Sequence, residues 1–479
     1  MQTSPASSSP RLVIRRLPSR GWVGVWSALS VLLLSAVAFA QAQLGAIQGT
    51  VSDENGKKLG SVTVVVQGPA LQEFQSEITD AAGKYIITQL PPGDDYQIAF
   101  YFGSDDKPKE ERKGIRISIG KTLTINATIQ LTSGKREVKV IRESAPNVDT
   151  SSASTGVEIN QEILRNTPVR GRTYDSVLAL APGAADVAPR NFSTSGGGAT
   201  PGSDVGVSVS GSTGAENSFF IDGVNTTDPN TGIAGTELSQ YFIREITVNT
   251  GGYQAEFGRA TGGVINLVTK SGGNEFHGSV FGSIQPYQLD PRTVARLGES
   301  LSTRTKTNLL YDVGFDLGGY LWKDHIWFYV GFAPTVTELQ VQRRVRTQTY
   351  NPNNDGTTLA EADPNYECPN YLRNSALCSG ARQLALRTTE ISDGAQDFIR
   401  TKRLYNGIAK LQFNFSPDHN LTLGYIASPS EYDDYAGTRS LDVASQKYYR
   451  IDQIHDANAR YIGKLFNRKL QIDILYGYH

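Results

Sequence analysis

The chain has 479 residues, a formal net charge of −1 and a pI of about 6.6. This near-neutral balance does not indicate a nucleic-acid partner, and the length suggests roughly three domains. After residue 40 no run of about 18 apolar residues occurs, so any later membrane crossing would have to use β-strands.

The first 40 residues have the pattern of a secretory signal peptide. Arginines between Arg11 and Arg20 precede an apolar stretch at residues 23–39, and a small-x-small motif ends at Ala40. This pattern predicts cleavage between Ala40 and Gln41 and an exported mature chain. A single membrane-spanning helix is the alternative, because about 20 apolar residues are enough to cross a bilayer.

Only two cysteines occur, Cys368 and Cys378, and both lie in one polar stretch. In an exported protein, two cysteines this close together predict a disulfide within a loop. Two free thiols are the alternative, whereas a metal site would need more ligands than this pair supplies.

Residues 41–132 are predicted to form a small antiparallel β-sandwich. Short apolar alternations recur there between turns rich in Asp, Asn, Gly and Pro, which is typical of this architecture. Two aspartates, Asp94 and Asp95, stand directly before Tyr96, and the register of the strand that begins there is left open. About seven strands are expected, at residues 47–51, 62–66, 78–79, 85–87, 96–102, 115–119 and 123–131.

The turns of this region follow one another in a recognisable order. Gly49-Thr50-Val51 is followed by Gly83-Lys84-Tyr85 and then by Leu90-Pro91-Pro92-Gly93. The pattern resembles the carboxypeptidase regulatory-like fold over nearly the whole segment. The resemblance implies a domain without catalytic residues, and no histidine occurs between residues 41 and 240. A periplasmic docking module and a folded spacer are both open as its role.

Residues 156–274 carry a second pattern. Asn160 is predicted to cap a short helix that runs through Leu164, and residues 173–180 are predicted to form another helix. A strand at residues 243–248 leads into the glycine-rich run 251–274, which contains a further strand and ends at Ser-Gly-Gly-Asn. Glycines in such a run permit positive φ and close backbone approach.

The order of these elements resembles the plug domain of TonB-dependent outer-membrane receptors, particularly those of the Oar type. Such a plug fills the lumen of a transmembrane β-barrel, which implies contacts with the inner barrel wall for Glu256 and Arg259. The other charged residues here, among them Asp222, Glu245 and Lys270, are expected to be solvated or paired, because an unpaired buried charge is costly. The signature residues of the resemblance are Ile221, Asp222, Gly223, Glu256, Arg259, Gly262, Gly263 and Asn266.

The linker at residues 133–155 contains a short β-prone segment. A segment of this kind can add an edge strand to a partner protein. Its position matches the TonB box of the receptors named above, which implies that the inner-membrane energy coupler pairs with it and pulls. The alternative is that the segment merely begins the plug sheet. The candidate residues are Glu137, Val138, Lys139, Val140 and Ile141.

Residues 275–479 alternate in the manner of membrane β-strands. Between residues 309 and 317 the odd positions are apolar and suit lipid, whereas the even positions include Asp312 and Asp316 and suit a polar lumen. This arrangement predicts the start of a barrel with periplasmic turns and extracellular loops. Short polar turns fall at residues 322–325, 416–419 and 467–469, and long polar loops at residues 286–307, 340–403 and 429–453.

Trp322, Trp327, Phe328 and Tyr329 flank one short turn and are expected in the aromatic girdle at the membrane interface. About seven strands are expected before His479, whereas the resemblance implies a barrel of about 22 strands. An open sheet edge in lipid leaves unpaired backbone groups. The chain is therefore expected to be the N-terminal part of a longer protein.

The predicted fold is mainly β: an N-terminal β-sandwich, an α+β plug and the first strands of an antiparallel transmembrane β-barrel. The resemblance implies an outer-membrane receptor for energised uptake of a scarce ligand. The sandwich and plug would face the periplasm and the long loops the outside. The resemblance associates an N-terminal regulatory-like extension with receptors for larger nutrients, which favours a glycan or a peptide as the ligand. The expected partners are a TonB-type energy coupler, an extracellular ligand and outer-membrane lipid.

Adhesion or surface display, with the barrel as an anchor, is the alternative function. An enzyme is not expected, because the five histidines show no metal-ligand spacing and no nucleophile motif occurs. No catalytic, metal-binding or cofactor-binding residue is therefore assigned. No cofactor is expected either, since the inner-membrane proton gradient would supply the energy.

Overall fold

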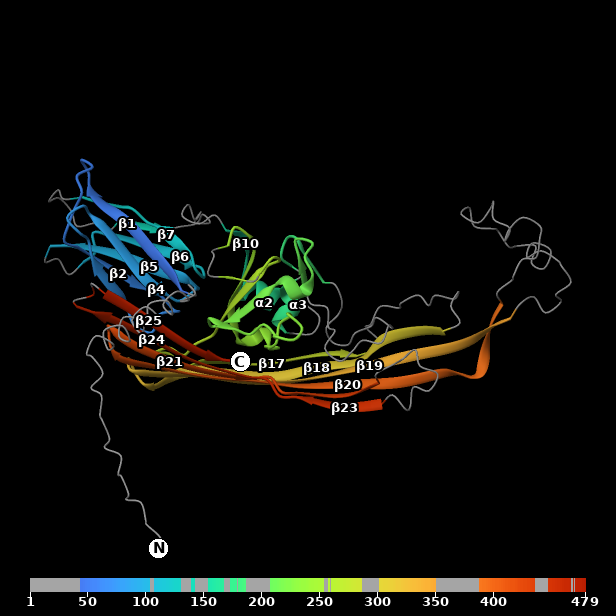
Figure 1. The fold of residues 1–479 in the computed structure, drawn as a ribbon. Coiled ribbons are helices and arrows are strands. Elements are labelled where there is room, and N and C mark those ends of the chain that lie inside the picture. The colour runs from blue at the N-terminus through green and yellow to red at the C-terminus, as the bar shows by residue number, and fades with distance from the viewer. Residues whose placement is uncertain are drawn as a thin grey trace, which may run out of the picture. The chain divides into compact units, whose positions relative to one another are not determined.

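A computed structural model describes most of the chain from residue 44 onward (Figure 1). The predicted cleavage site Ala40–Gln41 and the pair Cys368 and Cys378 lie outside the described residues, as do Glu137, Val138, Glu256 and Arg259. The predictions made for them stay predictions. The described residues are 44–103, 107–130, 139–142, 154–167, 173–178, 180–186, 207–253, 257–258, 260–286, 301–349, 387–435, 447–466, 468 and 470–479.

The first domain, called the sandwich below, consists of two sheets around one core. One sheet has the order β4-β1-β7 with β8 also paired to β1, and the other has the order β3-β2-β5-β6-β9. Alternate residues point into the core, as in β2, where Val62, Val64 and Val66 are fully buried. The strands are β1 (Gly45–Asp53), β2 (Val62–Gln67), β3 (Gln75–Ile78), β4 (Lys84–Leu90), β5 (Gly93–Phe102), β6 (Glu110–Ile117), β7 (Thr122–Thr124), β8 (Ala127–Ile129) and β9 (Lys139–Arg142).

The last strand predicted for the sandwich, residues 123–131, differs from the expectation. It is broken into β7 and β8, and both run parallel to β1 rather than antiparallel. Between them the Asn126 side chain accepts a hydrogen bond from the Thr50 N–H at 2.9 Å, so a side chain replaces a ladder bond there. Alternation of residue types does not reveal such a replacement. The register left open at Tyr96 does shift, and Asp95, within β5 at the site of that shift, has φ of 62°.

The second domain, called the plug, is built on a five-stranded sheet of order β10-β15-β16-β13-β14. β10 (Thr155–Asn160) forms one edge, and Asn160 caps α2 (Gln161–Asn166) as predicted, by accepting from the Ile163 N–H at 3.0 Å. β16 (Val264–Thr269) is buried at every position in the middle of the sheet. The other elements are α3 (Tyr174–Leu178), β11 (Ala184–Asp186), β12 (Val207–Val209), η1 (Gly214–Glu216), β13 (Ser218–Ile221), β14 (Val224–Asn225), η2 (Gln240–Phe242) and β15 (Ile243–Gly251).

The third part, called the wall, is a nine-stranded sheet of antiparallel pairs. Its order is β17-β18-β19-β20-β21-β24-β25, with β22 and β23 off that path, which leaves the seven expected strands along it. Among the described residues no helix is long and apolar enough to cross a membrane. The strands are β17 (His277–Pro286), β18 (Leu301–Trp322), β19 (Ile326–Thr349), β20 (Arg387–Ser416), β21 (His419–Ala427), β22 (Ser430–Tyr435), β23 (Lys447–Asp452), β24 (His455–Leu465) and β25 (Leu470–Tyr478).

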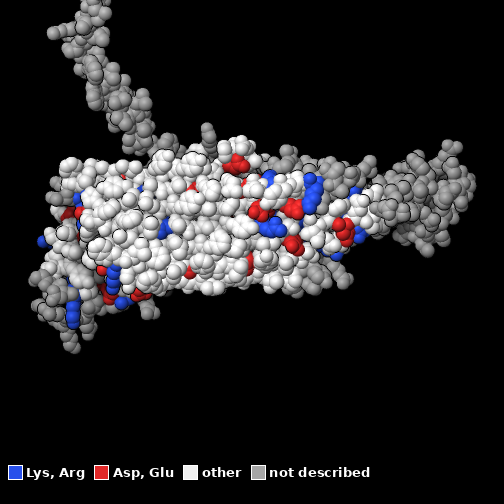
Figure 2. Space-filling model, turned by 90° about the horizontal axis from the view of Figure 1, so that it is seen from below, with Lys and Arg blue, Asp and Glu red and all other residues white. Residues whose placement is uncertain are grey.

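The two faces of the wall differ in the predicted way. In β18, Tyr311, Val313 and Phe315 are 39%, 51% and 46% exposed on the outer face. Asp312 and Asp316, on the inner face that meets the plug, are each 4% exposed. Figure 2 shows the outer face, where few charged side chains interrupt a broad uncharged band and most of them gather toward its ends. An uncharged band of this kind is what a lipid-facing barrel surface requires.

The long loops predicted for the wall are partly strand. β19 continues to Thr349 and β20 starts at Arg387, inside the predicted loop 340–403. β22 and β23 likewise pair within the predicted loop 429–453. Polar side chains stabilise these extensions across strands, as where Arg344 Nη1 lies 2.9 Å from Asp397 Oδ1. The prediction of loops from polar composition was therefore wrong for these segments, which are paired strands.

The aromatic girdle was predicted correctly only in part. Trp322 is largely exposed on the wall, but Trp327 and Tyr329 are buried. Trp327 Nε1 donates to Asn274 Oδ1 at 2.7 Å, so its polar group is satisfied within the protein. Alternation along β19 places these two aromatic side chains on the inner face, whatever their distance from the turn.

Candidate functional site

The described part of the candidate coupling segment lies on the sandwich. β9 contains Lys139, Val140 and Ile141, and it runs parallel to β6 as the last strand of that sheet. The register joins residues 110–113 of β6 to β9 one by one. The alternative that these residues begin the plug sheet is wrong, since that sheet starts at β10 and does not include β9.

The contact between β9 and β6 is small, because β9 has four residues. A backbone hydrogen bond contributes a net of about 0.5–1.5 kcal/mol, so a ladder this short contributes on the order of a few kcal/mol. A short strand at a sheet edge can be exchanged for another extended segment. β9 is therefore held in a defined place but by a releasable contact.

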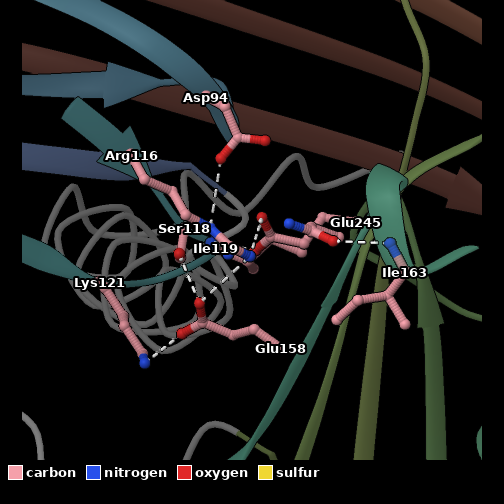
Figure 3. Close-up of polar contacts among 9 residues, drawn as sticks. Asp94, Arg116, Ser118, Ile119, Lys121, Glu158, Ile163 and Glu245 are labelled. Carbon is pink, nitrogen blue, oxygen red and sulfur yellow. Dashed lines mark hydrogen bonds and ion pairs between the residues drawn. The ribbon is translucent and has the colours of Figure 1, made fainter. Parts of the chain in front are cut away.

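A polar cluster joins the sandwich to the plug (Figure 3). The plug supplies two carboxylates, Glu158 from β10 and Glu245 from β15. Glu158 pairs with the ammonium of Lys121 and accepts a hydrogen bond from Ser118 Oγ at 2.7 Å. Glu245 accepts from the Ile119 N–H at 3.0 Å. Lys121, Ser118 and Ile119 all lie in the turn that follows β6, so this turn binds the plug.

Arg116, near the end of β6, lies between the two carboxylates. Its Nη2 is 3.7 Å from Glu158 Oε2 and 3.8 Å from Glu245 Oε2. Its Nε is 3.6 Å from Asp94 Oδ1 of the same domain. These distances exceed hydrogen-bond length but allow ionic attraction. Arg116 therefore adds charge complementarity to the interface rather than a fixed geometry.

The surroundings give the two plug glutamates different acidities. Burial raises the pKa of Glu245 to about 7, although the hydrogen bond from the Ile119 N–H opposes this. Burial acts on Glu158 as well, but the hydrogen bonds from Lys121 and Ser118 and the nearby positive charges hold the pKa of Glu158 below its ordinary value. Of these two groups, Glu245 is the one that changes charge near neutral pH.

Asp222 of the Ile221-Asp222-Gly223 motif connects the plug to the wall. Asp222 and Gly223 have φ of 47° and 87° and form the two-residue turn between β13 and β14. The Asp222 carboxylate lies 2.9 Å from Lys410 Nζ of β20, and it accepts from the Thr269 N–H and hydroxyl at 3.0 and 2.6 Å. Burial would raise the pKa of Asp222, but the charge of Lys410 and these bonds hold it below its ordinary value.

Two further ion pairs cross from the plug to the wall. Lys270 Nζ lies 3.1 Å from Asp316 Oδ2 of β18, and Glu237 Oε1 lies 2.6 Å from Lys402 Nζ of β20. The expectation of pairing is thereby confirmed for Lys270, as it is for Asp222. Sequence reasoning missed Glu237. The inward parity of Lys402 was an available signal, but its partner lies 165 residues away in the chain.

The paired glycines of the signature allow the chain to pack against a buried amide. A Cβ on Gly262 would lie 2.5 Å from Asn217 Oδ1, which no side chain tolerates. The Gly263 N–H donates to the same oxygen at 2.7 Å, and Asn217 Nδ2 donates to Val207 O at 2.6 Å. Asn266, in the following strand β16, is buried. Of the two reasons for glycine given by the sequence pattern, close backbone approach is the one that applies here.

The sandwich also contacts the wall, through hydrogen bonds in which at most one of the two partners is charged. Gln72 Nε2 donates to Gln412 Oε1 at 3.0 Å, and Asn414 Nδ2 donates to Glu73 Oε2 at 2.8 Å. A cavity of about 310 Å³ lies where this sandwich loop, the wall and Arg244 of the plug meet. The sandwich thus meets the wall through separate polar contacts around this cavity. The plug and the wall, by contrast, share a buried apolar cluster, to which Phe242 of the plug and Tyr329 and Ile408 of the wall belong.

Within the part of the chain that the structure describes, no group of three or more His, Cys, Asp or Glu side chains is placed to hold a metal ion. The site consists instead of a strand pairing, a polar cluster and a set of ion pairs.

Comparison with known proteins agrees with this architecture. Residues 46–132 match the carboxypeptidase regulatory-like domain, and residues 268–478 match the outer membrane beta barrel domain. The TonB-dependent transporter Oar of Myxococcus xanthus is 32% identical to this chain over 410 residues. The match covers 83% of this chain and 34% of Oar, so the chain spans about a third of the length of that relative.

Two solved structures also match this chain, at low similarity. The siderophore receptor PirA from Acinetobacter baumannii is 17% identical with a TM-score of 0.33, over 67% of this chain and 47% of that one. The outer membrane transporter YddB from Escherichia coli is 13% identical with a TM-score of 0.26, over 67% and 56%. The identity to Oar, the two domain matches and the two-faced wall agree with one another: this chain resembles the TonB-dependent outer-membrane receptors of the Oar type and carries an N-terminal carboxypeptidase regulatory-like domain.

Proposed function

We propose that this protein takes up a scarce extracellular ligand across the outer membrane, with energy from a TonB-type coupler in the inner membrane. The observation that carries the proposal is the order of β9 and β10. The candidate coupling segment is followed along the chain by the edge strand of the plug sheet. A pull on the segment is therefore applied to β10 at the edge of the plug sheet. An edge strand such as β10 separates from the sheet when its pairing with one strand, β15, is broken. The relationship to a protein named as a transporter supports this reading.

The contacts between plug and wall suit a plug that is held yet rearranges. The ion pairs between plug and wall come from the β13–β14 turn (Asp222), the position after β16 (Lys270) and the loop before η2 (Glu237). β10 supplies none of these three pairs. Withdrawal of β10 from β15 leaves those pairs in place, so a path opens beside the plug without its complete removal. The chain itself needs no cofactor for this, because the inner-membrane proton gradient is the energy source.

The ligand class proposed is a glycan or a peptide. The support is the N-terminal carboxypeptidase regulatory-like domain, an extension that the family resemblance associates with receptors for larger nutrients. The partners proposed are therefore the coupler, an oligosaccharide or peptide, and the lipid around the uncharged outer face of the wall.

Deletion of residues 137–141 tests the proposal. Cells that express the deletion variant are expected to bind ligand at their surface but to lose at least tenfold in uptake. The measurement is accumulation of fluorophore-labelled oligosaccharides and of labelled peptides, with collapse of the proton gradient as a second way to stop uptake. Deletion of residues 146–150, which shortens the same linker but spares the segment, is the matched control. Undiminished uptake after loss of residues 137–141 would contradict the proposal.

A further inference from the structure

β6 is the strand that holds the coupling segment. In the sheet of order β3-β2-β5-β6-β9, β6 pairs antiparallel with β5 on one side and parallel with β9 on the other. Without β9, β6 would be the edge strand of this sheet, and an open strand edge binds extended segments. The sandwich therefore offers a strand-binding edge, and the occupant of that edge is the segment to which coupling is assigned above.

β6 also contacts the plug, near its other end. Residues 110–113 pair with β9, whereas Arg116 lies 3.7 Å from Glu158 and 3.8 Å from Glu245. The turn after β6 adds the hydrogen bonds from Ser118 and from the Ile119 N–H to the same two carboxylates (Figure 3). One strand of the sandwich and its turn thus contact both the coupling segment and the edge strand of the plug.

The order of these contacts along the chain determines where a pull acts. β9 ends at Arg142 and β10 begins at Thr155. While β9 stays paired with β6, a pull on it is resisted by the sandwich, which is bound to both plug and wall. After β9 leaves β6, the 16 residues from 139 to 154 can span about 58 Å at most, since an extended chain spans about 3.3–3.6 Å per residue. The pull then reaches β10, and with it the plug sheet.

We propose that the sandwich regulates coupling: its β6 edge binds Lys139–Arg142 as a strand, and the energy coupler has to displace that strand before a pull reaches the plug. This inference rests on the coupling role proposed above. It also decides between the two roles left open for the sandwich, because a domain that binds the coupling segment is a docking module and not a spacer.

A disulfide between β6 and β9 tests the proposal. Glu111 and Val140 are register partners, so Glu111→Cys with Val140→Cys in the full receptor places two thiols on adjacent strands. The oxidised variant is expected to bind the purified periplasmic domain of the coupler at least tenfold more weakly than its reduced form. Dithiothreitol is expected to restore binding. Binding is measured by biolayer interferometry on the receptor in lipid nanodiscs.

The matched control is a disulfide that shares one cysteine but leaves β9 free. Ala99 of β5 is the register partner of Glu111 on the opposite side of β6, so the control is Ala99→Cys with Glu111→Cys. Both variants keep the native Cys368 and Cys378. Oxidation of the control is expected to leave coupler binding within twofold of the reduced form.

Equal coupler binding by the oxidised and reduced β6–β9 variant would overturn the proposal, because the coupler would then add to the free edge of β9. A disulfide that does not form, as judged by mass spectrometry, would overturn it too, because the segment would not lie on β6. If the reduced variant and the wild type both fail to bind the coupler, the proposed coupling role itself is wrong. That result is distinguishable, since it does not depend on oxidation.

Discussion

The plug is held on two sides, and these sides differ in how far their charges are shielded from water. Toward the wall, the side chains of Lys270, Lys402 and Lys410 are 9%, 4% and 6% exposed. Toward the sandwich, Arg116 and Lys121 are 35% and 40% exposed. The wall contacts are thus buried ion pairs, whereas the cations of the sandwich contacts are open to solvent.

This difference sets the order in which the contacts separate. An exposed ion pair contributes about 0–1 kcal/mol and is screened by salt. Removing one partner of a buried pair destabilises a protein by about 3–5 kcal/mol, because the other charge stays buried alone. Under the proposed coupling role, a pull that enters through β9 and β10 would therefore separate the sandwich side first and leave the plug seated against the wall.

The largest effect is expected on the wall side, from Lys410→Ala. Asp222 then stays buried beside Thr269 without its cation, so the seated plug is expected to lose about 3–5 kcal/mol of stability. The measurements are the melting temperature in detergent and the rate at which protease cleaves the plug. The double variant Lys410→Ala with Asp222→Asn is expected to recover part of the loss, because it removes the unpaired charge.

Arg403→Ala is the matched control on the same strand. Arg403 faces the other side of β20, where it is 44% exposed and pairs with Glu431 at 3.7 Å. Its loss is expected to change stability by less than about 1 kcal/mol. Equal destabilisation by the two single variants would show that burial does not distinguish the contacts, and the proposed order of separation would lose its basis.

A smaller, pH-dependent effect is expected on the sandwich side. The docked Glu245 has its pKa raised from 4.5 to about 7 by burial, so docking is strongest below pH 4.5 as far as this group is concerned and weakens as pH rises through 7. Between pH 6 and pH 8 the titration of Glu245 is expected to lower the equilibrium constant for docking of the sandwich on the plug about tenfold. Glu158, whose pKa is lowered, has the opposite sign: its contribution is present above its ordinary pKa of 4.5 and is lost in acid.

The pH effect is measured on a receptor whose linker carries an inserted protease site after residue 143. After cleavage, the sandwich is held by its contacts alone, and the fraction that dissociates is expected to rise from pH 6 to pH 8. Glu245→Gln, which cannot titrate, is expected to remove this dependence. A dissociation that is independent of pH in the wild type, or that keeps its pH dependence in the Gln variant, would assign the effect to another group.

Local patterns predicted the fold well where one face of a strand is buried. The alternation of Tyr311, Val313 and Phe315 with Asp312 and Asp316 gave both faces of β18 correctly. It failed where strands carry polar residues on both faces, as in the extensions of β19 and β20. There the strands are stabilised by their cross-strand partners, and a partner more than 50 residues away is not visible in a local pattern.

The candidate site was predicted less completely, for the same reason. Asp222 and Gly223 were identified because the Ile221-Asp222-Gly223 motif resembles that of the receptor family, and the structure places both residues in a two-residue turn. The pairing of β9 with β6 was not, since any β-prone segment fits several edges and the sequence does not say which one is open. Glu237 and Glu245 acquire their roles from residues of another domain, and no spacing rule connects them.

Hydrogen exchange measured by mass spectrometry, with and without the periplasmic domain of the coupler, tests the central claim most directly. The account predicts that coupler binding increases exchange in residues 110–117, which form β6 of the sandwich, and in residues 155–160, which form the edge strand β10 of the plug. The amides of β16, residues 264–269, should stay protected, because the buried wall contacts hold that part of the plug in place. Exchange that rises in β16 as early as in β10 would contradict the account, since the plug would then leave the wall as one unit.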